Sequence, residues 1–194
     1  MSIEAVVIAA GEGRRLRPLT ERWPKPLLPI DGRPVIAMLL RELEAAGLER
    51  TTVVVGHLGD QIRRLLAGVD VRFAAQPEPL GSADAVRYAV EAGATPPFVV
   101  TAADTLYAAG DLRRFVETWE RSGTAGAHAP PLWGLGPELV AFLDDLPGPP
   151  YELQTAFRRA AEDGLVPVTV ELGPTRSLTE PTDVVVHNFV YLEG

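Results

Sequence analysis

The chain has 194 residues, of which 46% are hydrophobic and 23% are charged, and this composition is typical of one globular domain. A net charge of −8 argues against nucleic acid as the main partner, because a phosphate backbone requires a basic face. The absence of cysteine excludes disulfides, thiolate metal sites and cysteine nucleophiles. No basic leader precedes an apolar stretch and no apolar run reaches membrane-spanning length, so we expect a cytoplasmic protein without a membrane partner.

The amino-terminal half alternates between strand and helix patterns. An apolar run over residues 3–10, rich in valine and isoleucine, predicts a buried strand. Further strands are predicted at 51–55, 69–75 and 98–102. Helices are predicted at 34–47, 60–66 and 81–93. Strands linked by helices through short connections are typical of α/β proteins, so we expect a three-layer, Rossmann-like open sheet, mostly parallel, with helices on both faces.

The carboxy-terminal half carries weaker patterns. Apolar residues at helical spacing predict helices at 111–121 and 151–164. A strand is predicted at 126–132, but its prolines restrict it to an edge position or a kinked segment. The remaining predicted elements are a strand at 166–172 and a closing helix at 183–191.

The first predicted strand leads into a glycine-rich turn at 11–14 that is followed by arginines. The turn is no P-loop, because no Gly-Lys-Ser/Thr follows at the required spacing. It also differs from the dinucleotide fingerprint, since Leu16 stands where the third glycine belongs. What remains is a backbone loop that can wrap phosphates, with cations placed directly after it.

Lys25 is the only lysine in the chain, against seventeen arginines. Together with Arg15 it brings two cations to one place, on a segment stiffened by prolines. A compact ammonium suits a phosphate whose geometry changes during a reaction better than a planar guanidinium does. The alternative is a plain strand-turn with an incidental surface lysine.

The run AAGEGRRLRPLT at 9–20, with KPLLP at 25–29, resembles the amino-terminal motif of the sugar-phosphate nucleotidylyltransferases. These enzymes couple a nucleoside triphosphate to a sugar 1-phosphate and release pyrophosphate. The resemblance implies that Arg15 and Lys25 are catalytic cations. It also implies a set of nucleotide-binding residues in the turn: Ala9, Ala10, Gly11, Glu12, Gly13 and Arg14.

Ligands of parallel sheets lie beyond the carboxyl ends of the strands, so the glycine turn, residues 76–82 and Asp104 are expected to converge. The run from Gln76 to Ala83 is similar to the family's second motif, in which a glutamine contacts the base and a Gly-Ser/Thr-Ala turn opens a helix near the nucleoside. An amide offers both the donor and the acceptor that a base edge needs. Gly81 and Ser82 are therefore candidate nucleotide-binding residues, and helix capping explains Ser82 equally well.

Asp104 directly follows a predicted buried strand, where an aspartate can cap a turn or hold magnesium beside a triphosphate. The resemblance implies the second role, with Mg²⁺ as the cofactor. His57 ends another strand, and we expect it to be a loop residue near the pocket mouth, because nucleotidyl transfer onto a phosphate needs no strong base.

The resemblance weakens towards the carboxy terminus. Ser177 stands where the family carries a second metal-binding aspartate, and a hydroxyl binds magnesium poorly. Glu180 or Asp183 could supply that ligand, substrate phosphates and water could complete the shell, or activity could be reduced. No lysine follows residue 25, so the sugar-phosphate contact falls to one of three arginine candidates: Arg158, Arg159 and Arg176.

We therefore expect one domain over 1–194, with a nucleotide-binding half at 1–110 and an acceptor half at 111–194. Its expected partners are a nucleoside triphosphate and a sugar 1-phosphate, and an oligomer is compatible with the sequence. The alternatives are a same-fold nucleotidyltransferase acting on molybdopterin, phosphocholine or a related phosphate, an attenuated nucleotide-binding pseudo-enzyme, and a plain interaction module.

Overall fold

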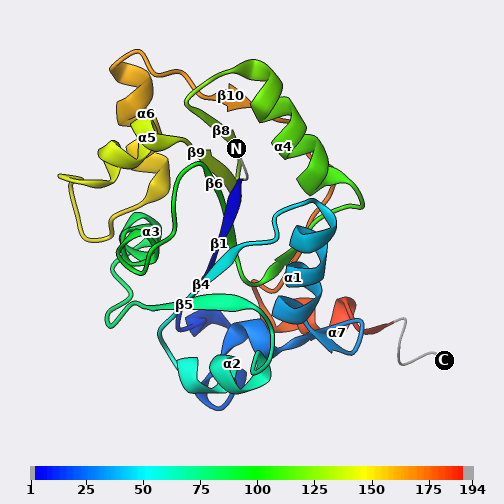
Figure 1. Ribbon diagram of the computed structural model, residues 1–194. Coiled ribbons are helices and arrows are strands. Elements are labelled where there is room, and N and C mark those ends of the chain that lie inside the picture. The colour runs from blue at the N-terminus through cyan, green and yellow to red at the C-terminus, as the bar shows by residue number, and fades with distance from the viewer. Residues whose placement is uncertain (1–2, 190–194) are drawn as a thin grey trace.

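A seven-stranded central sheet organises the computed structural model, which describes residues 3–189 (Figure 1). The strand order is β10-β8-β9-β6-β1-β4-β5. The strands of this sheet are β1 (Glu4–Ala9), β4 (Thr51–Val55), β5 (Val71–Ala75), β6 (Phe98–Ala102), β8 (Gly126–Ala129), β9 (Leu132–Leu135) and β10 (Val168–Thr169). All neighbours pair in parallel except β9, which runs antiparallel to β6 and β8. The predicted mostly parallel α/β fold is confirmed.

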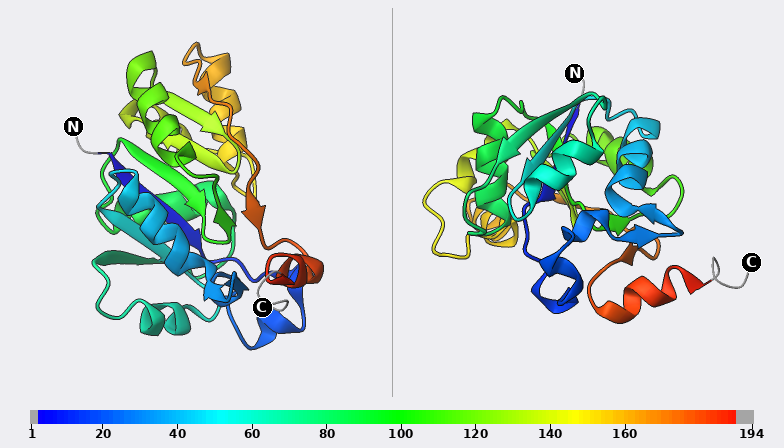
Figure 2. Two further views of the ribbon diagram at one scale, coloured as in Figure 1. Left: turned by 90° about the vertical axis from the view of Figure 1, so that its right-hand side faces the viewer. Right: turned by 90° about the horizontal axis from the view of Figure 1, so that it is seen from below.

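Helices cover both faces of the sheet (Figures 1 and 2). The longer helices are α1 (Val35–Ala45), α2 (Gly59–Leu65), α3 (Ser82–Glu91), α4 (Asp111–Ser122) and α6 (Leu153–Glu162). Alternate side chains of β1 point to opposite faces. Val7 joins the core under α1 and α4, whereas Val6 joins the core under α3 and α6. This two-sided burial explains the continuous apolar run at the start of the chain.

The carboxy-terminal half differs from its prediction in three elements. The strand predicted at 126–132 corresponds to β8. It is not an edge strand, because it pairs with β9 on one side and with β10 on the other. Its prolines form the turn between β8 and β9, where they interrupt no strand pairing. The strand predicted at 166–172 is reduced to the two residues of β10.

The closing helix predicted at 183–191 is also wrong in its bounds. The helix α7 covers Pro181–Val186, and residues 190 and 191 lie outside the described part of the chain. It begins early because Glu180 and Asp183 form a capping box around Pro181, and proline suits the first helical position. The strand β9 leads into α5 (Pro137–Val140), which continues as η4 (Ala141–Leu143).

Short elements complete the chain. They are the strands β2 (Pro29–Ile30), β3 (Arg33–Pro34), β7 (Thr105–Leu106) and β11 (Arg176–Ser177), and the 3₁₀ turns η1 (Arg14–Leu16), η2 (Leu19–Glu21) and η3 (Lys25–Leu27). The β2–β3 hairpin lies beside α7 (Figure 2), where the Asp31 backbone N–H donates to the His187 carbonyl. Within residues 3–189, none of the helices combines the length and the apolar character needed to cross a bilayer.

Candidate active site

The carboxyl ends of β1, β4, β5 and β6 bring the predicted segments together at one edge of the sheet. Ala9 is in register with Val55, and Val55 is in register with Ala75. On the other side, the backbone N–H of Ala103 donates to the Ile8 carbonyl at 2.9 Å. The glycine turn, Gln76 and Asp104 therefore follow directly from strands that end together.

The glycine turn depends on a left-handed residue and on one buried hydroxyl. Gly13 has φ = 62°, a conformation that glycine adopts without steric cost. Thr20 is 1% exposed, and its Oγ1 donates to the Gly13 carbonyl at 2.9 Å. A Cβ on Gly13 would lie 2.8 Å from the Thr20 methyl group, so no larger residue fits here.

The arginines after the turn differ in their contacts. Arg14 donates from Nε to Glu12 at 2.8 Å, and Arg17 lies 3.7 Å from the same carboxylate. The hydrogen bond and charge of Arg14 lower the pKa of Glu12. Arg15 is exposed and has no ion pair with any of residues 3–189, so of these three cations it is the one left for a ligand.

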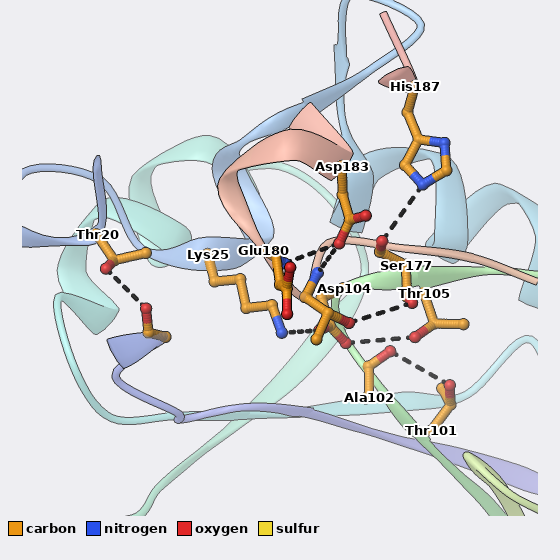
Figure 3. A network of polar contacts seen from close by, with 12 residues as sticks. Thr20, Lys25, Thr101, Ala102, Asp104, Thr105, Ser177, Glu180, Asp183 and His187 are labelled. Atoms are coloured by element: carbon orange, nitrogen blue, oxygen red, sulfur yellow. Dashed lines mark hydrogen bonds and ion pairs between the residues drawn. The ribbon is translucent and has the colours of Figure 1, made fainter. Parts of the chain in front are cut away.

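Lys25 and Asp104 form an ion pair between Nζ and Oδ2 (Figure 3). The Lys25 side chain is 21% exposed and the Asp104 side chain is 14% exposed. The hydroxyl of Thr105 donates to the other carboxylate oxygen of Asp104 at 3.3 Å. The structure thus joins the only lysine of the chain to the predicted metal ligand in a largely buried pair.

Ser177 lies beside this pair. It is on β11, which runs antiparallel to β7 and places Ser177 opposite Thr105. The next residue, Leu178, donates its backbone N–H to the carbonyl of Asp104 at 3.1 Å. Ser177 is therefore close to Asp104 in space, and its equivalence to a second metal-binding carboxylate stays a prediction.

The two acidic alternatives to Ser177 serve as helix caps (Figure 3). Asp183 accepts backbone N–H groups from Thr179 at 2.6 Å and Glu180 at 2.8 Å. These bonds, the one from Glu180 foremost, lower the pKa of Asp183, and the charge of Lys25 adds to the effect. The side chain of Glu180 accepts the Asp183 N–H in the same capping box.

A magnesium ion would find one carboxylate here. Within the described part of the chain, no three His, Cys, Asp or Glu side chains gather in a possible metal cluster. The Lys25 ammonium on Asp104 shows that this carboxylate accepts a cation. Magnesium usually binds through one or two carboxylates, several waters and substrate phosphates. The residues present fit that arrangement, with Asp104 as the protein ligand.

Gln76 is 4% exposed and its amide group is engaged inside the protein. Its Nε2 donates to Asp84 at 2.7 Å and to the Gly81 carbonyl at 3.1 Å. Only the Oε1 oxygen of this amide remains for a ligand. A base contact that also uses the Nε2 donor therefore requires Gln76 to give up its bonds to Asp84 and Gly81.

Gly81 and Ser82 connect α3 to the start of α6. A Cβ on Gly81, which has φ = 123°, would overlap the backbone of Tyr151. The hydroxyl of Ser82 donates to Glu152 at 2.6 Å and accepts the Leu153 N–H at 2.9 Å. Ser82 is thus no cap of its own helix, in contrast to the capping alternative. The sequence pattern gave no signal for Tyr151 and Glu152.

The three candidate acceptor-side arginines lie in two places. Arg158 and Arg159 line a surface pocket on α6, and Arg159 donates to the Asp145 carbonyl at 2.7 Å. Figure 1 shows α6 at the opposite end of the molecule from α7. Arg176 is next to Ser177 on β11, but its Nη1 pairs with Asp31 at 2.7 Å. Only Arg176 is therefore near Asp104.

Two side chains from the part of the chain after β4 contact the segment that follows the glycine turn. The ring Nε2 of His57 lies 2.9 Å from the Thr20 carbonyl. The amide of Gln61 donates to the Arg22 carbonyl at 2.9 Å. His57 is thus a loop residue beside the site, as predicted, and its observed contact holds the segment that carries the cations.

A glycine turn, a lysine and a carboxylate at the carboxyl edge of a parallel sheet are placed where α/β proteins of this class bind their ligands. Residues 5–165 match the family described as the MobA-like NTP transferase domain, and the chain belongs to this family. The resemblance to nucleotidylyltransferases that the opening motif indicated is thereby confirmed.

Individual relatives agree with this family. The chain is 41% identical over 81 residues to a CMP-5'-(3-aminopropyl)phosphonate synthase from Streptomyces rubellomurinus, a match of 40% of this chain and 13% of that protein. It is 34% identical over 131 residues to the low-salt glycan biosynthesis nucleotidyltransferase Agl11 from Haloferax volcanii, covering 64% of this chain and 36% of that protein. The chain thus spans about a third or less of the length of these curated relatives.

A solved structure gives the same fold over nearly the whole chain. A UDP-glucose pyrophosphorylase from Acinetobacter baumanii superposes with a TM-score of 0.82 at 19% identity. The match covers 98% of this chain and 93% of that chain. At this identity the similarity establishes the architecture.

Proposed function

We propose that the protein is a magnesium-dependent nucleotidylyltransferase that couples a nucleoside triphosphate to a sugar 1-phosphate and releases pyrophosphate. The observation that carries the proposal is the Lys25–Asp104 pair beside the glycine turn, in a chain of this family. The nucleotide is assigned to the half at 1–110 and the acceptor to the half at 111–194, which reaches the pair through β11.

The reaction needs positioning and charge stabilisation more than covalent chemistry. An oxygen of the acceptor phosphate attacks the α-phosphorus in line, and the bond from that phosphorus to the β-phosphate oxygen breaks. Backbone amides of residues 11–14 hold the triphosphate, Arg15 neutralises the departing pyrophosphate, and Lys25 contacts the reacting phosphates. Magnesium, when bound, neutralises phosphate charge, and Asp104 is the residue that would hold it.

A second class of molecule is a candidate for the acceptor substrate. The relative with 41% identity carries a phosphonate in its name, so transfer onto a phosphonate or another phosphate competes with transfer onto a sugar 1-phosphate. The position of Arg158 and Arg159 on α6 also leaves Arg176 as the cation of the acceptor half that lies nearest to Asp104. The nucleotide chemistry is the same for both acceptors.

The test combines binding with turnover. A thermal-shift panel crosses the common nucleoside triphosphates and Mg²⁺ with sugar 1-phosphates and a phosphonate, and pyrophosphate release is measured for each pair. We expect one triphosphate with Mg²⁺ to raise the melting temperature and one acceptor class to release pyrophosphate. If no triphosphate stabilises the protein, a plain interaction module replaces this proposal.

Lys25→Ala should lower turnover by about 10²–10³-fold, the usual cost of removing one charge-stabilising group. Arg121→Ala, on the exposed surface of α4, is the matched control and should keep full turnover. Turnover near that of the native protein in Lys25→Ala would remove Lys25 from the mechanism.

A further inference from the structure

In the largely buried pair of Lys25 and Asp104, both carboxylate oxygens of the predicted metal ligand already have partners. Oδ2 of Asp104 holds the ammonium, and Oδ1 accepts the hydroxyl of Thr105 at 3.3 Å. A divalent cation that binds Oδ2 of Asp104 in the free protein must displace Lys25, and one that binds Oδ1 would lie next to the positive charge of the ammonium. The side chain of Lys25 occupies the place of the cation.

The residues around the pair provide few additional ligands for a metal that displaces Lys25. Ser177 brings a neutral hydroxyl to the position opposite Thr105, and Oδ2 of Asp183 accepts two backbone N–H groups that cap α7. A single carboxylate gives a divalent cation one protein ligand out of the six that Mg²⁺ requires. The remaining ligands must come from water and from substrate phosphates.

Separating the pair without substrates is unfavourable, because it leaves two opposite charges unpaired in a site that is mostly shielded from water. A triphosphate alone would draw Lys25 away and leave Asp104 without a cation. A divalent cation alone would take Asp104 and leave Lys25 without an anion. When the two arrive together, each side chain receives a new partner of opposite charge.

We infer that Lys25 acts as a stand-in cation on Asp104, so that divalent metal and nucleoside triphosphate bind this protein only jointly. The inference rests on the proposed function for the nature of the nucleotide, whereas the exchange of partners rests on the pair itself. It predicts a positive coupling between the two ligands, and such couplings usually change affinity by about 5–150-fold.

The test measures Mn²⁺ binding to the intact free protein by electron paramagnetic resonance, without nucleotide and without turnover. The native protein should bind Mn²⁺ weakly. Lys25→Met frees Asp104 and should tighten Mn²⁺ binding by about tenfold. The double variant Lys25→Met/Asp104→Asn should return to the weak binding of the native protein. Circular dichroism spectra show whether each variant is folded.

Arg15→Met is the matched control, because it also removes one positive charge near the turn but leaves the pair intact. It should change the Mn²⁺ affinity of the free protein by less than about threefold. An equal gain in Arg15→Met and Lys25→Met would mean that net charge alone is responsible, and would overturn the inference. Tight Mn²⁺ binding by the native free protein would also overturn it.

A second arm measures the coupling with α,β-methylene analogues of UTP, TTP, CTP and GTP, which cannot release pyrophosphate. The analogue that binds should tighten Mn²⁺ binding to the native protein by about tenfold or more, and by a smaller factor in Lys25→Met. A coupling of equal size in both proteins would contradict the role of Lys25. If neither these four analogues nor α,β-methylene-ATP binds, the proposed function fails, while the arm with free protein still decides whether Lys25 blocks Asp104.

Discussion

The hydroxyl group of Thr20 controls the geometry of the glycine turn. It donates to the carbonyl of Gly13, and the ring of His57 holds the carbonyl of Thr20 in turn. The methyl group of Thr20 also fills the space that a side chain at residue 13 would need. These contacts fix the direction in which the turn presents its backbone amides to a ligand.

Thr20→Val removes the hydroxyl and keeps the shape of the side chain. We expect the free energy of unfolding to fall by about 0.5–1.5 kcal/mol, the net value of one hydrogen bond. The KM for the nucleotide should rise severalfold, because the turn becomes less ordered. Denaturant unfolding and steady-state kinetics measure the two effects. Thr118→Val on α4 is the control, and a similar rise of KM in that variant would contradict the prediction.

Gln76→Glu tests the buried contact with Asp84. The amide donor is replaced by a carboxylate that faces the Asp84 carboxylate, where the native donor–acceptor distance is 2.7 Å. Two carboxylates at that separation cannot both ionise, so the pKa of the introduced carboxyl should rise above about 4.3, its value in the unfolded chain. The variant should lose roughly 2–4 kcal/mol of stability at pH 7.

The sign of the pH dependence follows from the raised pKa. The folded variant holds its extra proton at low pH, so its stability should fall as the pH rises from about 4 towards the raised pKa. Urea unfolding of Gln76→Glu between pH 4 and pH 8 measures this slope. Gln76→Met, which adds no charge, serves as the comparison. Parallel pH profiles for the two variants would show that the carboxylates do not interact.

Single residues of the site were predictable where composition or motif singled them out. Lys25 stands alone among arginines, and Asp104 directly follows a buried strand. The partners of Gln76 and Ser82 were not predictable, because Asp84 and Glu152 reach them only through the packing of α3 and α6. Local sequence carries no information about which distant side chain will satisfy a buried donor.

At the level of elements, the short helix α7 is attached to the β2–β3 hairpin that follows η3. Asn188, just after α7, donates to the Pro29 carbonyl at 2.9 Å and accepts the Gly32 N–H at 2.8 Å. Arg176 on β11 pairs with Asp31 in the same hairpin. The carboxy-terminal segment therefore supports the part of the chain that directly follows Lys25.

Asp183→Ala removes the cap at the start of α7. The variant should lose about 1 kcal/mol of stability at pH 7, which is typical for a lost helix cap. The pKa of Asp183 is lowered below its usual 3.8, so the native contribution is present above that pH and is lost as the pH falls through the lowered pKa. The difference in unfolding free energy between native protein and variant should thus shrink below about pH 4.

Urea unfolding at pH 7 and pH 3 checks this prediction. Asp163→Ala, at the exposed carboxy-terminal end of α6, is the control and should show a smaller difference at both pH values. A difference for Asp183→Ala that stays constant between pH 7 and pH 3 would show that the carboxylate is not the group that caps α7.

Long periodic elements could be predicted, and two-residue strands could not. The run at 3–10 and the helix at 34–47 bury apolar side chains at regular spacing, which leaves a clear pattern in the sequence. β7 and β11 have two residues each and exist only because they pair with one another. The site depends on this pairing, since it places Ser177 beside Asp104, and no local pattern announces it.

Across the whole molecule, the two halves of the chain meet at the Lys25–Asp104 pair. The amino-terminal half supplies both members of the pair, and β11 of the carboxy-terminal half pairs with β7, the strand that follows Asp104. Ser177 belongs to the carboxy-terminal half, and a charged residue at this position would lie near Asp104 of the amino-terminal half. We therefore expect residue 177, in the carboxy-terminal half, to affect how strongly the site holds a metal before substrates arrive.

Ser177→Asp places a second carboxylate beside Asp104, and we expect the free protein to gain a divalent metal site. Without metal, the added negative charge should lower the melting temperature, because the new carboxylate lies near Asp104 and the two like charges repel. Mn²⁺ or Mg²⁺ should restore it, and a concentration of about ten times Kd stabilises the folded state by about 1.4 kcal/mol. Pyrophosphate release at low Mg²⁺ should then rise severalfold, since the second carboxylate lets the metal bind before the nucleotide arrives. Thermal unfolding with and without Mn²⁺ measures the drop in melting temperature and its restoration by metal. The control for these measurements is Ser177→Asn, which has a similar shape but no charge. Equal metal responses in the aspartate and asparagine variants would show that residue 177 does not face the cation position on Asp104.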